Sequence, residues 1–389
     1  MSTNDIRSIS DGGIEAQTEP TLFEKVTGVE TEEIGADDSI TDPFDPTLIR
    51  VGTKPLTLDL LVSRLRQNEF NLAPDFQRKS GIWTDGAQSR LIESILIRIP
   101  LPAFYIDASD DEKWVVVDGL QRLSTLKRFV VDDNLRLSDL EFLKSLEGKT
   151  YSQLPRTFQR RIEETQVTVY LIEPSTPPEV KFNIFKRINT GGLPLSLQEI
   201  RHALNQGEAT RFLKKLADSD EFKVATDESV RDERMGDREF VLRFLAFVLV
   251  PYTQYRSKDF DSFLNDRMAE MNKMTPQQLL NLQNLFSRAM QAAYVIFERD
   301  AFRKRYDPDH PRYPVNKALF ETWSTSLAQL SDDELQRVLA QRETLKSNFM
   351  KRLIRGGDLD SAISTGTGDI RKVRLRFSVI EGLVREVAG

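Results

Sequence analysis

The spacing of hydrophobic residues divides the chain into a mixed N-terminal part and a helical C-terminal part. Three short apolar runs rich in β-forming residues predict strands: residues 103–107, 114–117 and 166–173. Between these runs, and throughout the chain from about residue 205, apolar residues recur with the spacing of amphipathic helices. The pattern predicts an α+β fold, with a small mixed domain at 47–204 and a larger all-helical domain at 205–389.

Several predicted helices carry recognisable start signals. Residues 56–70 have helical apolar spacing, and Ser196 with Glu199 forms a capping box for a later helix. Further helices are predicted at 85–99, 178–188, 240–250, 276–299 and 370–387. The segment 240–250 is apolar apart from Arg243, so we expect it to be the buried centre of the helical domain.

The N-terminal segment 1–46 differs in composition from the rest of the chain. It contains twelve Asp and Glu residues against two basic residues, a net charge of −10, which leaves +4 for the remainder. Because this segment lacks hydrophobic periodicity, we expect a disordered acidic tail. A role as a nucleic-acid mimic or an autoinhibitor is the alternative.

The first candidate site is the stretch WVVVDGLQRLSTL at 114–126. It predicts a buried strand, a tight turn at Asp118-Gly119 and a helix that opens with Gln121 and Arg122. Asp118 is a suitable N-cap, and Gln121 can complete a capping box. The amides of such a helix start suit a phosphate, and Arg122 adds donors for its oxygens. A capped helix with a surface arginine explains the same residues, so both interpretations stay open.

Two other stretches, and one group of basic residues, are weaker candidates. FKRINTGG at 185–192 places Asn and Thr beside two glycines, which suits close approach to a ligand or an ordinary helix end. PDFQR at 74–78 places polar residues beside an aromatic, which can hold a base or anchor a loop. Basic residues near the C-terminus can contact a polyanion or coat a solvated helix face: Lys351, Arg352, Arg355, Arg371, Lys372, Arg374 and Arg376.

The composition excludes several classes of site. The chain has no cysteine, which rules out disulfides, zinc fingers, iron–sulfur clusters and a cysteine nucleophile. Its two histidines, His202 and His310, are far apart, so a His-Asn-His nuclease has almost no residues to work with. No apolar run approaches the ~20 residues needed to span a membrane, and the N-terminus lacks a signal-peptide pattern. We expect a cytoplasmic protein without membrane association.

Three motifs in this order resemble one protein family. PDFQR with Trp83, VVDGLQRLSTL, and FKRINTGGLPLSLQEIRHAL are similar to the N-terminal domain of GmrSD-type, modification-dependent restriction proteins. GDREFVLRFLAF and ISTGTGDIRKVRLRF resemble the helical part of these proteins, so the resemblance covers roughly residues 50–385. It implies a ParB/sulfiredoxin-like nucleotide-binding domain at 47–204.

The resemblance also implies roles for individual residues. The family signature, Asp-Gly-Gln-Gln-Arg followed by Thr, is associated with nucleoside-triphosphate binding and hydrolysis that controls DNA cleavage. The implied catalytic residues are Asp118, Gln121 and Arg122, with Asp118 also holding Mg²⁺. The implied nucleotide contacts are Gln77, Arg78, Gly119, Arg122, Thr125, Lys186, Asn189, Thr190 and Gly191. Leu120 replaces the first Gln of the signature; it reduces hydrolysis if that position faces the ligand and is a packing change if it faces inward.

Three functions follow as hypotheses. The first is an NTP-binding and NTP-hydrolysing module of a modification-dependent restriction or anti-phage defence system that acts on DNA. A separate nuclease subunit would complete it, because this chain offers no His-Asn-His domain. The second is a non-enzymatic regulator that binds DNA or a partner and has a degenerate nucleotide pocket. The third is a nuclease that uses the carboxylates of Asp107, Asp110 and Asp118.

Overall fold

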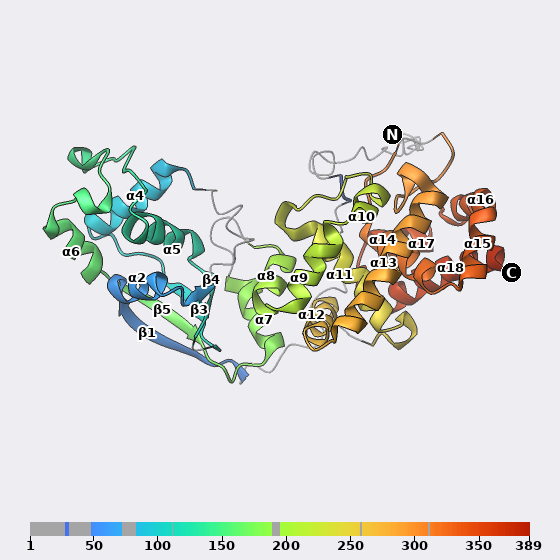
Figure 1. Cartoon of the computed structure of the whole chain (residues 1–389), viewed down its shortest axis with the longest axis horizontal. Coiled ribbons are helices and arrows are strands. Elements are labelled where there is room, and N and C mark those ends of the chain that lie inside the picture. Colours follow the sequence, from blue (N-terminus) through green and yellow to red (C-terminus); the bar gives the residue numbers. More distant parts are fainter. Residues whose placement is uncertain are drawn as a thin grey trace, which may run out of the picture.

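The computed structural model describes residues 28–30, 48–71, 83–110, 112–188, 195–256, 259–309 and 312–389. They form two lobes that lie side by side along the longest axis of the molecule (Figure 1). Within these residues, the N-terminal lobe contains the sheet, and the C-terminal lobe is built of helices. The predicted α+β class is confirmed. The closer likeness to the ParB/sulfiredoxin fold stays a prediction.

The sheet of the N-terminal lobe has the strand order β1-β5-β3-β4-β2. The strands are β1 Val51–Thr57, β2 Phe70–Asn71, β3 Phe104–Asp107, β4 Trp114–Asp118 and β5 Gln166–Ile172. β1 pairs with β5 and β3 with β4 in antiparallel fashion, whereas β3–β5 and β2–β4 are parallel. β3, β4 and β5 coincide with the three predicted strands to within one residue at each end.

β1 is an edge strand that the sequence pattern does not predict. In the structure this strand ends at Thr57, and helix α2 occupies only Leu58–Arg66, so the prediction of a helix over 56–70 is wrong at both ends. Gly52 and Pro55 weaken the strand signal. The strand forms because all seven of its residues pair with β5, and an edge position tolerates a proline.

Helices cover both faces of the sheet. They are α2, α4 Asp85–Leu96, α5 Leu120–Leu126 with the π-helical turn Lys127–Val131, α6 Arg156–Glu164, α7 Pro178–Ile188 and α8 Leu197–Leu204. Along β4, Val116 packs in the cluster formed with α2, α4, α5 and α6. Its neighbours Val115 and Val117 pack with residues of α7 and α8. Successive strand residues point to opposite faces, which explains why β4 is apolar from Trp114 to Val117.

The C-terminal lobe is organised around two buried helices, α11 and α14 (Figure 1). Its helices are α9 Glu208–Ala217, α10 Asp220–Ala225, α11 Gly236–Leu249, α12 Phe260–Met271, α13 Pro276–Phe297, α14 Lys317–Ala328, α15 Asp332–Ala340, α16 Arg342–Arg352, α17 Asp358–Ser364 and α18 Ile370–Ala388. Residues 240–247 of α11 are all buried, which confirms the predicted central helix. The pattern does not single out α14, since its buried Thr322 and Ser324 are polar and are satisfied by carbonyls of their own helix.

The core of this lobe encloses a group of charges. The carboxylate of Glu321 is fully buried, forms an ion pair with Arg376 and lies 3.5 Å from Nη1 of Arg243. Arg376 is itself completely buried. The prediction that Arg376 can contact a polyanion is therefore wrong, because its guanidinium donates to Glu321 inside the lobe.

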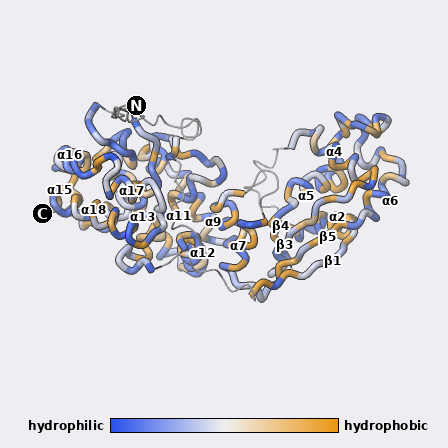
Figure 2. Tube along the Cα trace, turned by 180° about the vertical axis from the view of Figure 1, so that it is seen from behind, coloured by the Kyte–Doolittle hydropathy of each residue, from blue (hydrophilic) through white to orange (hydrophobic). Residues whose placement is uncertain are grey.

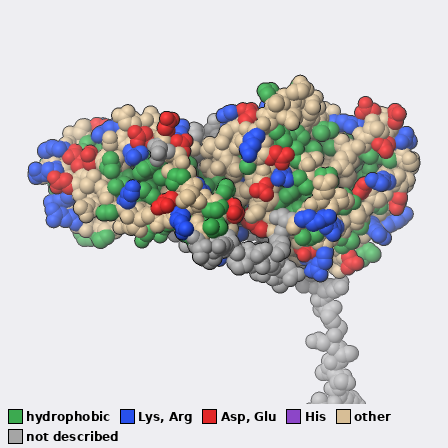
Figure 3. Space-filling model, turned by 90° about the horizontal axis from the view of Figure 1, so that it is seen from below, with side chains coloured by type: hydrophobic (Ala, Val, Ile, Leu, Met, Phe, Trp, Pro, Cys, Tyr) green, Lys and Arg blue, Asp and Glu red, His purple; other side chains and the backbone are tan. Residues whose placement is uncertain are grey.

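The surface of the molecule is charged and mixed in sign. Hydrophobic residues follow the strands and the helices packed on them (Figure 2). On the face shown in Figure 3, acidic and basic side chains are interspersed, and basic ones gather towards both ends of the long axis. No helix in the described ranges is long and apolar enough to cross a membrane.

Candidate functional site

The turn between β4 and α5 consists of a single residue, Gly119. Its φ is +100°, and a Cβ atom there would lie 2.4 Å from Cδ1 of Phe104. Both the left-handed backbone and the close contact require glycine. Gly119 is also the N-cap of α5, which has no side-chain cap. The predicted cap by Asp118, with a capping box to Gln121, is therefore wrong: Asp118 is still part of the strand.

Arg122 is buried, so the interpretation of this residue as a surface arginine is wrong. Its Nη2 donates to a carboxylate oxygen of Asp118 at 2.9 Å and to the carbonyl of Ala103 at 3.2 Å. Its Nη1 donates to the carbonyl of Pro102, and its guanidinium lies 4.5 Å from the ring centre of Phe104. Burial lowers the pKa of Arg122, and the nearby carboxylate of Asp118 opposes this shift. These contacts tie the β4–α5 turn to the segment before β3.

The predicted catalytic residues Asp118 and Gln121 and the predicted nucleotide contact Thr125 differ in solvent exposure. The side chain of Asp118 is 29% exposed, with Oδ2 held by Arg122. Gln121 is half-buried, and its side chain forms no hydrogen bond with any described residue. Thr125 is 1% exposed, and its hydroxyl donates to the carbonyl of Gln121 at 2.8 Å. Asp118 and Gln121 are therefore accessible to a ligand, whereas a nucleotide contact by Thr125 stays a prediction.

Leu120, which replaces a glutamine of the family signature, packs against apolar side chains. It contacts the cluster of Ala203 and Met235, together with Val115 and Leu195. This cluster joins the start of α5 to α8 and to the turn before α11. The structure therefore supports the interpretation that leucine at this position of the signature is a change in packing.

Six more of the predicted nucleotide contacts fall outside this turn. Nζ of Lys186, at the end of α7, lies 3.1 Å from Oδ2 of Asp261 in α12, and Arg201 engages the other oxygen of the same carboxylate. Lys186 thus links the two lobes, and a nucleotide contact by it stays a prediction. The remaining five lie outside the described residues: Gln77, Arg78, Asn189, Thr190 and Gly191.

A stacked tyrosine pair beside Asp118 is not evident from the sequence. Tyr105 lies opposite Asp118 in the β3–β4 pair and opposite Tyr170 in the β3–β5 pair. The two rings are 4.7 Å apart and inclined by 16°. Burial raises the pKa of Tyr105, and the charges of Tyr170 and Asp118 add to this shift. The alternating strand pattern places each tyrosine on a strand, but only the register of the sheet brings them together.

The comparison with protein families covers this part of the chain. Residues 58–206 match the family model of the GmrSD restriction endonuclease, N-terminal domain. The segment is a GmrSD-type N-terminal domain. It begins with α2 and ends just after α8, so it contains the β4–α5 turn and the two weaker candidate stretches, 74–78 and 185–192. The match confirms the resemblance for this domain and associates it with restriction systems. The chain has no match among curated proteins or among solved structures.

A strained turn contacts the GmrSD-type domain from the helical lobe. Arg234 and Met235 have φ values of 55° and 59°, and such left-handed residues other than glycine cost of order 1–3 kcal/mol each. Arg234 is held there by an ion pair with Glu199 at 3.2 Å and by Ser196, whose hydroxyl donates to its carbonyl. Ser196 and Glu199 also form the predicted capping box. The turn thereby presents Met235 to the cluster that contains Leu120.

The carboxylates of the nuclease hypothesis do not converge. Asp107 lies opposite Val115 in the β3–β4 pair, three residues before Asp118, a separation of roughly 10 Å. It is buried and lies 3.3 Å from Nζ of Lys181. No group of three or more metal-binding side chains exists within the described ranges. A nuclease centre built on Asp107, Asp110 and Asp118 is therefore wrong for this fold.

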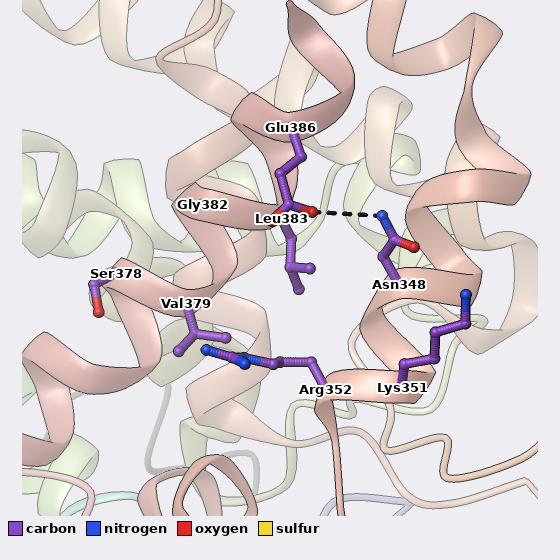
Figure 4. A pocket seen from close by; sticks show the side chains of 8 residues that line it. All are labelled: Asn348, Lys351, Arg352, Ser378, Val379, Gly382, Leu383 and Glu386. Atoms are coloured by element: carbon purple, nitrogen blue, oxygen red, sulfur yellow. Dashed lines mark hydrogen bonds between the residues drawn. The ribbon is translucent and has the colours of Figure 1, made fainter.

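A groove between α16 and α18 gathers some of the predicted basic residues. It has a volume of about 500 Å³ and is lined by Asn348, Lys351, Arg352, Ser378, Val379, Gly382, Leu383 and Glu386 (Figure 4). The amide of Asn348 donates to Glu386 at 3.5 Å, whereas Lys351 and Arg352 are exposed and have no acidic partner among the described residues. A Cβ at Gly382 would meet no atom within 4 Å. The groove is open and carries two positive charges that no acidic side chain of the described ranges neutralises.

Proposed function

We propose that this chain is the nucleotide-binding module of a restriction or anti-phage defence system that acts on DNA. In this proposal the β4–α5 turn of the GmrSD-type domain binds and hydrolyses a nucleoside triphosphate, and a separate subunit supplies the nuclease. The position of Asp118 carries the proposal. Its carboxylate is partly exposed at the end of an interior strand and is oriented by the buried Arg122. The side chain of Gln121, which has no hydrogen-bond partner in the described part of the chain, is nearby in sequence.

The proposal gives these residues different roles. Asp118 orients the attacking water or the metal, and Gln121 contacts the phosphate or that water. Arg122 acts as a positioning residue, because its guanidinium is already engaged by Asp118 and two backbone carbonyls. The stack of Tyr105 on Tyr170 adds an aromatic surface close to the same carboxylate.

Mg²⁺ fits this turn as an ion shared with the nucleotide. One oxygen of Asp118 is engaged by Arg122, and the other is left for a cation. In nucleotide sites Mg²⁺ commonly binds one or two carboxylates, phosphate oxygens and water, so a full set of protein ligands is not required. The ion would neutralise charge on the phosphates, while the protein contributes the carboxylate and its orientation.

The test is calorimetric titration of the full chain with ATP, GTP, CTP and UTP, with and without Mg²⁺, followed by measurement of phosphate release. We expect one nucleotide to bind and Asp118→Asn to reduce its hydrolysis about 100-fold or more, with the unfolding midpoint nearly unchanged. The matched control is Asp132→Asn, which alters another ion-paired aspartate after the same helix and should leave hydrolysis unchanged. Undiminished phosphate release by the Asp118 variant would remove this residue from the mechanism.

A second candidate function is favoured by the inward contacts of Arg122. A guanidinium that is already engaged by backbone carbonyls suits a regulator that has kept the fold without the catalysis. Such a chain would bind DNA or a partner protein and release no phosphate. Absence of binding to all four nucleotides, with DNA binding retained in a mobility assay, selects this candidate over the first.

A further inference from the structure

A short extended segment, Gly28-Val29-Glu30, is seated on the helical lobe. Val29 forms an isolated parallel bridge with Val315. The amide of Glu30 donates to the carbonyl of Val315 at 2.9 Å, and the amide of Val315 donates to the carbonyl of Gly28 at 3.0 Å. Such strand-like pairing is how many domains bind extended peptides.

Each of the three residues is matched by a different feature of the lobe. Gly28 has a φ of +68°, and a Cβ there would lie 2.8 Å from the carbonyl oxygen of Ser229. Val29 packs against the hydrophobic core of the lobe. Conformation and close approach therefore select glycine at the first position, and the apolar contact selects an aliphatic residue at the second.

The carboxylate of Glu30 is bound by two side chains of the lobe. Nζ of Lys304 lies 2.5 Å from one oxygen, and the amide of Asn316 donates to the other at 3.1 Å. The side chains of Lys304 and Glu30 are only 9% and 16% exposed. A charge-assisted bond of this kind is stronger in such a sheltered place than on an open surface.

The lobe also holds partners that would keep Lys304 satisfied without Glu30. Its ammonium group lies 3.5 Å from Oδ1 of Asp360 and donates to the hydroxyl of Ser364 at 2.6 Å. A buried lysine left without a carboxylate would be costly. Because Asp360 already lies beside Lys304, the ammonium group keeps a carboxylate partner when Glu30 leaves. This partner lowers the cost of releasing the segment.

We propose that the helical lobe carries a binding site for an extended peptide of the type glycine–aliphatic–glutamate, and that residues 28–30 occupy it as a releasable latch. Because β1 begins at Val51 in the other lobe, this latch links the N-terminal segment to both lobes. Residues 28–30 of the predicted tail are thus held against the lobe, whereas the rest of residues 1–46 lies outside the described residues. The proposal is independent of nucleotide binding, since none of its residues lies at the β4–α5 turn.

Hydrogen exchange on the full chain tests the latch. In the wild type we expect slow exchange of the amides of Glu30 and Val315. Exchange at both should accelerate at least tenfold in Glu30→Gln, in Gly28→Val and in Lys304→Met. Glu33→Gln removes the same charge three residues later and should change neither rate. Fast exchange of the Glu30 amide in the wild type, or unchanged protection in Gly28→Val, would overturn the proposal.

Binding in trans provides a second, independent readout. A fluorescent synthetic peptide covering residues 24–34 should bind the full-length Glu30→Lys variant, in which like charge beside Lys304 vacates the site. It should bind the wild type at least tenfold more weakly, and a peptide with valine in place of Gly28 should not bind either chain. Amide protection that rises with protein concentration would assign the site to a second copy and overturn the latch within one chain.

Discussion

At the scale of single residues, Asp237 shows how burial and a neighbouring charge raise the pKa of a carboxyl group. It lies in the first turn of α11, is buried, and accepts a hydrogen bond from the amide of Arg238. Burial, with the negative charge of Asp232 next, raises its pKa from 3.8 to about 6. Between these values the folded state binds more protons than the unfolded state, so this carboxyl makes the fold less stable as the pH rises.

We predict that Asp237→Asn stabilises the protein at neutral pH. The amide keeps the shape and the acceptor but removes the buried charge. The free energy of unfolding should rise by about 1–3 kcal/mol at pH 7.5, and the gain should vanish near pH 4. Urea unfolding at both pH values measures it. The control Asp309→Asn changes an exposed aspartate and should have almost no effect. A gain that is equal at pH 4 and pH 7.5 would contradict the role of ionisation.

At the scale of elements, the β4–α5 connection depends on one glycine. β4 must end and α5 must begin within a single residue, and the ring of Phe104 lies directly over that residue. The same ring packs under the guanidinium of Arg122, which orients Asp118. The packing of the connection and the geometry of the candidate site are therefore coupled.

Gly119→Ala should destabilise the fold by about 2–4 kcal/mol, the sum of a strained backbone and an overpacked contact. Gly148→Ala is the matched control, because its φ is +79° but a Cβ there meets no atom within 4 Å. It should cost only about 1 kcal/mol. The difference between the two, measured by urea unfolding, reports the contact with Phe104. Equal costs would show that the ring moves aside freely.

At the scale of the whole molecule, the two lobes offer separate surfaces. The candidate nucleotide turn lies in the N-terminal lobe, whereas the groove of Lys351 and Arg352 lies in the helical lobe, between α16 and α18. Basic side chains without an acidic partner among the described residues suit a phosphate backbone better than basic side chains already paired with carboxylates. If the chain acts on DNA as proposed, this groove is the described surface that we expect to contact it.

We predict that Lys351→Gln combined with Arg352→Gln weakens DNA binding. Each lost phosphate contact lowers the salt dependence, so the slope of log affinity against log salt should fall by about 2. Fluorescence anisotropy with a labelled duplex at several salt concentrations measures it. The control pair, Arg342→Gln with Lys346→Gln, removes equal charge from the same helix at positions already near Glu343. Equal losses for both pairs would point to net charge and not to the groove.

The sequence by itself determined most elements and the family of the domain. Strands β3, β4 and β5 and the central helix α11 follow from local periodicity, because a buried strand or helix must repeat its apolar residues at a fixed spacing. The ordered motifs of the GmrSD-type domain are likewise local, and they identify residues 58–206 without a structure.

Only the tertiary structure decided which way the charged residues face and which distant segments meet. Arg122 and Arg376 resemble surface residues in the sequence, yet each is buried by carbonyls or carboxylates that approach from other elements. β1 exists through its pairing with β5, more than 100 residues later, and Glu30 is held by Lys304 from the far end of the chain. Burial and pairing depend on contacts between segments far apart in sequence, and no local pattern records those contacts.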